Sequence, residues 1–115
     1  MYRRKYHNKK TVVDGIKFDS KLEAQRYTEL RVMQRTGLIK DLALQPEYEL
    51  QPKFQKNGKT YRKIVYKADF SYIRAKDGKT IVEDTKGFKT DVYAIKKKLF
   101  EYRYPELTIK EITRR

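Results

Sequence analysis

Three acidic residues occupy positions in the sequence where an apolar side chain would be expected. Glu23 continues the i, i+4, i+7 stripe that Tyr27 and Leu30 form in a predicted helix. Asp69 stands between aromatic residues in the middle of a predicted strand, and Asp84 stands in the strand that follows. A buried carboxylate is costly unless it is paired or bound to a cation. These positions therefore predict a site where carboxylates hold a divalent ion.

Asp84 and Lys86 share one face of their predicted strand, because side chains alternate along a strand. The turn at Asp77 and Gly78 makes this strand the neighbour of the strand that carries Asp69. Partner numbers across that turn should sum to about 155, which places Asp69 opposite residue 86 and Asp84 one diagonal step away. Two carboxylates beside a lysine suit Mg²⁺ or Mn²⁺, since the acids bind the ion and the lysine meets a polyanion or positions water.

Each acid also has a plainer interpretation. Glu23 could serve only as the glutamate of the S-x-x-E capping box that opens its helix, although the two roles do not exclude each other. Asp69 could be a turn or edge residue, but no Gly, Asn or Pro stands near it. Asp84 and Lys86 could form an ordinary pair on a solvated strand face.

The remaining elements must hold these residues in place. Gly follows Asp or Asn in three predicted turns between short runs of strand-forming residues. Gly37 ends the first helix and Pro105 the second. The predicted order is strands 11–13 and 16–18, a helix from 20 to about 35, strands 47–54, 61–73 and 80–86, a helix from 91 to about 104, and a strand over 107–112. This order predicts one α+β domain over 11–115, with two main helices flanking a mixed sheet that contains an antiparallel meander.

The second predicted helix is amphipathic. Its apolar residues recur at steps of three and four, which predicts a stripe that faces the core. The stripe consists of Val92, Ile95, Leu99 and Tyr102. Lys96 and Lys98 flank it, and phosphate contact is their natural use.

The composition limits the available chemistry. The chain carries 29 Lys and Arg against 15 Asp and Glu, a net charge of +14, with no cysteine and one histidine. Without cysteine there is no disulfide framework, no thiolate nucleophile and no cysteine zinc site. No run approaches the roughly 18 apolar residues of a membrane helix, so we expect a cytoplasmic protein with no membrane partner and no organic cofactor. The charge predicts a polyanionic partner, most simply nucleic acid, although a ribosome-associated or membrane-surface protein would share it.

Basic residues gather in three segments. Residues 1–10 are interpreted as a flexible basic arm that orders on a phosphate backbone, with a solvated tail as the alternative. The hairpin over 53–63 either tracks a DNA arm and enters a junction, or only aids solubility. The predicted DNA-contacting residues are Arg3, Arg4, Lys5, Lys9, Lys10, Lys56, Lys59, Arg62, Lys96 and Lys98.

The pattern of acids resembles the PD-(D/E)XK nuclease superfamily, whose core is a helix with a glutamate, a strand hairpin with Asp and (Asp/Glu)-x-Lys, and a following helix and strand. The matching segments are FDSKLEAQRY with Glu23, YKADFSY with Asp69, and VEDTKG with Asp84 and Lys86. The whole chain is similar to small phage-encoded proteins related to Holliday junction resolvases of the RecU type, over nearly all of residues 5–112. Ala68 stands where the superfamily name has proline.

The resemblance implies Mg²⁺-dependent hydrolysis of DNA phosphodiester bonds in a restriction-endonuclease-like fold, with Mn²⁺ as a substitute. Asp69 and Asp84 would bind the metal, with the carbonyl of Thr85 and a water held by Glu23. Lys86 would orient the attacking water or stabilise charge on the phosphate. A homodimer that cleaves four-way junctions is the implied form, since two symmetric cuts need two active sites.

Other interpretations remain open at this point. Glu83 adjoins Asp84 and could be the functional acid if the strand is bulged. The chain could also be a non-catalytic nucleic-acid-binding protein, or a nuclease of the same fold that cuts linear duplex DNA.

Overall fold

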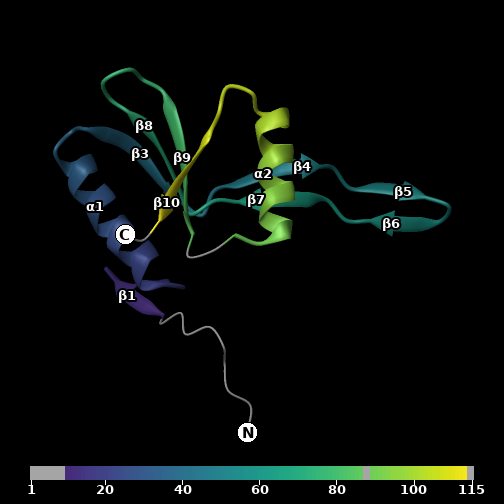
Figure 1. Cartoon of the computed structure of the whole chain (residues 1–115), viewed down its shortest axis with the longest axis horizontal. Helices are drawn as coiled ribbons and strands as arrows, with labels where there is room; N and C mark the ends of the chain where they lie inside the picture. Colours follow the sequence, from purple (N-terminus) through teal and green to yellow (C-terminus); the bar gives the residue numbers. More distant parts are fainter. Residues whose placement is uncertain (1–9, 87–88, 114–115) are drawn as a thin grey trace, which may run out of the picture.

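A four-stranded sheet in the order β10-β9-β8-β3 forms the centre of the structure (Figure 1). The computed structural model describes residues 10–86 and 89–113 of the 115-residue chain. The strands are β3 (Ile39–Leu44), β8 (Phe70–Arg74), β9 (Thr80–Lys86) and β10 (Ile109–Thr113). β8 is antiparallel to both β3 and β9, whereas β10 is parallel to β9. The sheet is therefore mixed, as predicted.

Three two-stranded ribbons surround this sheet. They are β1 (Thr11–Val13) with β2 (Ile16–Phe18), β4 (Glu47–Gln51) with β7 (Ile64–Lys67), and β5 (Phe54–Lys56) with β6 (Lys59–Tyr61). Asp14 and Gly15 join the first pair, and Asn57 and Gly58 join the third, all with positive φ of 52–76°. Positive φ at both central residues is what a type I′ hairpin turn requires, so these two turns form where the sequence predicts them.

Both predicted helices are present. Helix α1 (Lys21–Arg35) begins at Ser20, whose side chain accepts a hydrogen bond from the Glu23 N–H. Helix α2 (Asp91–Arg103) begins at Thr90, whose side chain accepts a hydrogen bond from the Tyr93 N–H. Neither helix, in the part of the chain that the structure describes, is long and apolar enough to cross a membrane.

The two helices bury different sides of the molecule. Around α1 the buried residues are Phe18, Ala24, Tyr27, Leu30, Ile39, Phe70 and Tyr72. Around α2 they are Leu50, Tyr66, Ala68, Val82, Tyr93, Phe100 and Ile109. Val82 belongs to the α2 side, whereas Glu83, its neighbour in β9, is paired with Arg26 of α1. Because side chains alternate along β9, the helices lie on opposite faces of the sheet.

The strand predicted over 61–73 is broken into β6, β7 and β8. The break between β7 and β8 lies at Ala68 and Asp69. In one unbroken strand Tyr66 and Phe70 would share a face, but here they belong to different cores, with Tyr66 beside α2 and Phe70 beside α1. The bend between β7 and β8 resets which face each side chain takes.

The predicted meander is also incomplete. β3 pairs with β8, although no strand is predicted over 39–44, and β4 pairs with β7 in a separate ribbon. Asp41 and Gln45 have positive φ, and the β3 register shifts between Lys40 and Ala43. These irregularities interrupt the period-two pattern from which a strand is predicted.

The orientation predicted for α2 is wrong. Val92, Ile95, Leu99 and Tyr102 are 41–87% exposed, and the helix buries Tyr93 and Phe100 instead. The Phe100 ring lies 5.0 Å from that of Tyr48 and 5.3 Å from that of Tyr66. Packing these large rings buries more apolar surface than the aliphatic stripe would, so the aromatic face turns inward.

Candidate active site

Asp69 lies where the sheet divides. Its N–H donates to the Glu83 carbonyl at 3.1 Å, and its own carbonyl accepts from the Gln45 N–H at 2.9 Å. The preceding N–H, of Ala68, donates to the Pro46 carbonyl at 3.0 Å. Beyond this point β8 continues between β3 and β9, while β7 pairs with β4. Backbone bonds to both branches therefore fix Asp69 in place.

The side chain of Asp69 is tied to β9. Its Oδ2 accepts hydrogen bonds from the Thr85 N–H and the Thr85 hydroxyl, both at 2.7 Å. Phe70 pairs with Glu83. One further step along the same register sets Asp69 opposite Asp84, two residues away from the predicted partner at position 86. The two acids are thus closer in register than the sequence suggests.

Asp84 is a buried carboxylate, only 2% exposed, on the face of β9 that carries Val82. Its Oδ2 accepts a short hydrogen bond from the Tyr66 hydroxyl. Burial first, and then this bond and the charge of Asp84, raise the pKa of Tyr66. Tyr66 therefore stays protonated, and it holds the Asp84 carboxylate in one orientation.

Glu23 projects from the first turn of α1 and is 4% exposed. Burial raises its pKa from 4.5 to about 7, and the charges of Asp69, Asp19 and Asp84 act in the same direction, while a backbone hydrogen bond at Asp19 opposes them. The negative charges of Asp69 and Asp84, the two strand acids of the predicted site, thus act on Glu23. Its N–H also bonds to Ser20, so the capping interpretation and the site interpretation are compatible.

The three acids do not form a closed metal cage. In residues 10–86 and 89–113, no three His, Cys, Asp or Glu side chains are grouped so that they could hold a metal ion. The donor chemistry nevertheless fits Mg²⁺ or Mn²⁺, because every side-chain donor is a carboxylate oxygen. Glu23, Asp69 and Asp84 come from three different elements and interact electrostatically.

Glu83 has a different task from Asp84. It is fully buried, and both of its carboxylate oxygens accept hydrogen bonds from Arg26, at 2.8 Å from Nε and 2.7 Å from the terminal NH2 nitrogen. The Tyr72 hydroxyl donates to it as well. These bonds tie α1 to the sheet, so Glu83 is a structural anchor and the alternative of a bulged strand that presents it to the site is not supported.

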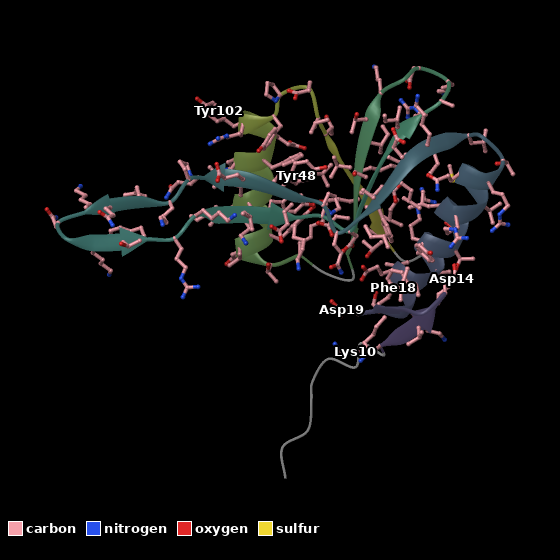
Figure 2. All side chains as sticks on the ribbon, turned by 180° about the vertical axis from the view of Figure 1, so that it is seen from behind. Lys10, Asp14, Phe18, Asp19, Tyr48 and Tyr102 are labelled. Carbon is pink, nitrogen blue, oxygen red and sulfur yellow. The ribbon has the colours of Figure 1, made fainter. Side chains whose placement is uncertain are left out.

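The structure describes only the backbone of Lys86, the lysine of the predicted site. Lys86 is the last residue of β9 and pairs with Thr113 of β10, but its side chain lies outside the described part of the structure. Arg3, Arg4, Lys5 and Lys9 of the basic arm also lie outside the described residues. Figure 2 shows Lys10 near Asp19, and their ion pair measures 3.3 Å.

The β5–β6 hairpin projects away from both helices as an extension of the β4–β7 ribbon (Figure 1). All of its residues are exposed, including Lys56, Lys59 and Arg62, the latter just beyond β6. The Phe54 and Tyr61 rings stack at 4.7 Å between centroids, and the Lys59 ammonium lies 5.1 Å from the Tyr61 ring. The predicted hairpin is confirmed, and the aromatic pair, which the sequence reasoning missed, sits at its base. A signal was available, because Phe54 and Tyr61 are equidistant from the Asn57-Gly58 turn.

Sequence reasoning also missed a cluster beside Asp84. Glu111 of β10 pairs in register with Asp84 and accepts a hydrogen bond from the Tyr93 hydroxyl at 2.7 Å. Lys89 and Lys97 form ion pairs with it at 2.9 and 3.3 Å. The Tyr93 bond first, and then Lys89, lower the pKa of Glu111 to about 2. Lys97 is therefore held at the sheet by its ion pair with Glu111, whereas no such pair is found for Lys96 and Lys98 among the described residues.

Residues 3–115 match the model of a family described as DUF1064, a protein of unknown function. Comparison with curated proteins and with solved structures gave no match. The family match covers nearly the whole chain, including Glu23, Asp69 and the Asp84-Thr85-Lys86 segment. The chain therefore belongs to the DUF1064 family.

Proposed function

We propose that this protein is a Mg²⁺-dependent endodeoxyribonuclease with a restriction-endonuclease-like core of the PD-(D/E)XK type. The observation that carries the proposal is the convergence of three acids where the sheet divides. Glu23 from α1 interacts electrostatically with Asp69 at the bend and with Asp84 in β9. The mutual repulsion of these acids destabilises the fold unless a cation offsets it, which supports a cation site in this basic chain of net charge +14.

Asp69 and Asp84 would hold the ion, with the Thr85 carbonyl as a further oxygen donor and a water held by Glu23. When bound, Mg²⁺ supplies Lewis-acid stabilisation of the phosphate and lowers the pKa of water. Thr85 orients Asp69 through its N–H and hydroxyl. Glu23, with a pKa of about 7, can accept or release a proton near neutral pH. Lys86 is proposed to stabilise charge on the phosphate.

The substrate is proposed to be branched DNA, most simply a four-way junction cut by a homodimer in the cytoplasm of a bacterial host. Exposed Lys56, Lys59 and Arg62 on or beside the projecting hairpin offer phosphate contacts beyond the body of the domain. The basic segment 1–10 and the lysines of α2 add to this charge. This distribution suits a substrate with more than one duplex arm.

The test is cleavage of a synthetic four-way junction and of a linear duplex of the same sequence, each with saturating Mg²⁺ or with chelator. We expect Mg²⁺-dependent strand scission, faster on the junction. Equal rates on both substrates would indicate a linear-duplex nuclease. Binding without scission of either DNA would leave the non-catalytic DNA-binding protein.

A further inference from the structure

The outer face of α2 carries an apolar stripe that the described part of the chain leaves exposed. Val92 is 62% exposed, Ile95 60%, Leu99 41% and Tyr102 87%. Figure 2 shows Tyr102 at the outer end of this helix. The spacing of three, four and three residues is that of the a and d positions of a heptad, which form the seam between two packed helices.

Rotating α2 so that the stripe faces inward would be unfavourable in free energy. The opposite face of α2 buries Tyr93 and Phe100, and Phe100 has no exposed surface. The Phe100 ring meets Tyr48 edge-on at 5.0 Å and also packs on Tyr66. Rotating the helix would expose these rings to cover smaller side chains. The exposed stripe is therefore a fixed feature of the surface.

Positive charge borders the stripe on both sides. With Val92 at position a, Lys96 takes position e and Lys98 takes position g, the two positions that flank the seam. Neither lysine forms an ion pair within the described residues, whereas Lys97, on the inner side, is paired with Glu111. A helix that covered the stripe would thus meet two unpaired ammonium groups.

A second copy of the chain fits this surface poorly. Antiparallel pairing about residue 97 would align Val92 with Tyr102 and Ile95 with Leu99. The same twofold axis would set Lys96 against Lys96 and Lys98 against Lys98, and like charges across a helix pair are destabilising. DNA could contact the flanking Lys96 and Lys98 but would not cover the stripe, because its apolar side chains offer no hydrogen-bond donor to phosphate.

We propose that this face of α2 docks an amphipathic helix of a second, different protein. That helix would carry apolar residues at its a and d positions and Glu or Asp at the flanking positions, where they would meet Lys96 and Lys98. The helix-in-groove mode requires only about 20 Å of exposed helix, which is the length of α2. The inference does not depend on the nuclease proposal, because the stripe lies outside the acidic site.

The test uses full-length protein and three labelled peptides of three heptads each, read by fluorescence anisotropy. One peptide has Leu at a and d with Glu at e and g. The second has Lys in place of Glu, and the third keeps Glu but has Ser at a and d. We expect the Leu and Glu peptide to bind at least about tenfold more tightly than either other peptide. The Ser peptide controls for general attraction to a +14 protein.

Two variants locate the binding on α2. Ile95→Ser combined with Leu99→Ser should reduce affinity at least about tenfold. Lys96→Glu combined with Lys98→Glu should reverse the preference toward the Lys peptide. Leu38→Ser, which alters an exposed leucine elsewhere, should change nothing, and circular dichroism should show all variants folded. Equal binding of all peptides, no binding, or a wild-type dimer that the double serine variant disrupts would overturn the proposal.

Discussion

At the scale of single residues, the neighbouring acids Glu83 and Asp84 of β9 have different partners and different roles. Glu83 accepts three hydrogen bonds, two from Arg26 and one from Tyr72, and is an anchor between helix and sheet. Asp84 is held by Tyr66 and lies beside the acids that raise the pKa of Glu23. The sequence shows both as adjacent acids in a strand, and only their partners distinguish the structural anchor from the proposed metal ligand.

Tyr66→Phe tests whether the Tyr66 hydroxyl positions a metal ligand. Removing an outer partner of a ligand typically costs 10- to 100-fold in metal affinity or activity, so we expect the Mg²⁺ concentration for half-maximal cleavage to rise by about tenfold or more. Tyr72→Phe is the matched control, since Tyr72 is equally buried and donates to Glu83 in the same way. It should lose about 1–3 kcal/mol of unfolding free energy but keep the wild-type Mg²⁺ dependence. Identical Mg²⁺ curves for the two variants would show that Tyr66 is only structural.

Glu23→Gln tests, through the pH dependence of stability, whether the fold raises the pKa of Glu23. Because the pKa of Glu23 is raised from 4.5 to about 7, the folded protein binds this proton more tightly than the unfolded chain does. Stability therefore falls as pH rises from about 4.5 to 7, by up to about 3 kcal/mol from this group. Urea denaturation without metal should show that the unfolding free energy of wild type decreases across this window relative to Glu23→Gln. Parallel pH profiles would mean that the fold does not raise the pKa of Glu23.

At the scale of elements, the projecting hairpin is proposed to contact DNA. We expect Lys56→Ala with Lys59→Ala to weaken junction binding and to reduce the slope of log K against log salt by about 2, one unit for each lost phosphate contact. Lys40→Ala with Lys76→Ala removes two exposed lysines elsewhere and is the charge-matched control. Equal slopes for the two double variants would place the hairpin away from DNA.

Most elements, but not their arrangement, could be predicted from the sequence. Local signals were sufficient for α1, α2 and the turns at Asp14 and Asn57, because a cap or a turn residue acts on its own neighbours. The bend at Asp69 and the strand β3 could not be predicted, since both depend on pairing between distant segments. Choosing which face of α2 turns inward likewise required knowing that the rings of Tyr48 and Tyr66 would face it.

At the scale of the whole molecule, the three acids of the candidate site could be singled out from the sequence, and their role stays a prediction. Glu23, Asp69 and Asp84 stand out because their types conflict with core-like positions, and the structure brings them into electrostatic contact. Thr85, Tyr66 and Glu111 could not be found this way, because hydroxyls and edge acids fit their local pattern without conflict. In a chain of net charge +14, the positive majority is proposed to serve DNA binding and an acidic minority the chemistry.

The most direct measurement of the central claim is the single-turnover rate of junction cleavage by wild type and Asp84→Asn at saturating Mg²⁺. Asp41→Asn is the control, since Asp41 is exposed with φ of 57°, a conformation that asparagine also adopts readily. We predict that Asp84→Asn binds the junction like wild type but cleaves at least about 100-fold more slowly, while Asp41→Asn cleaves normally. Folding of Asp84→Asn without metal should be unchanged or slightly improved, because a repulsive charge is lost. Wild-type cleavage by a folded Asp84→Asn would contradict the account.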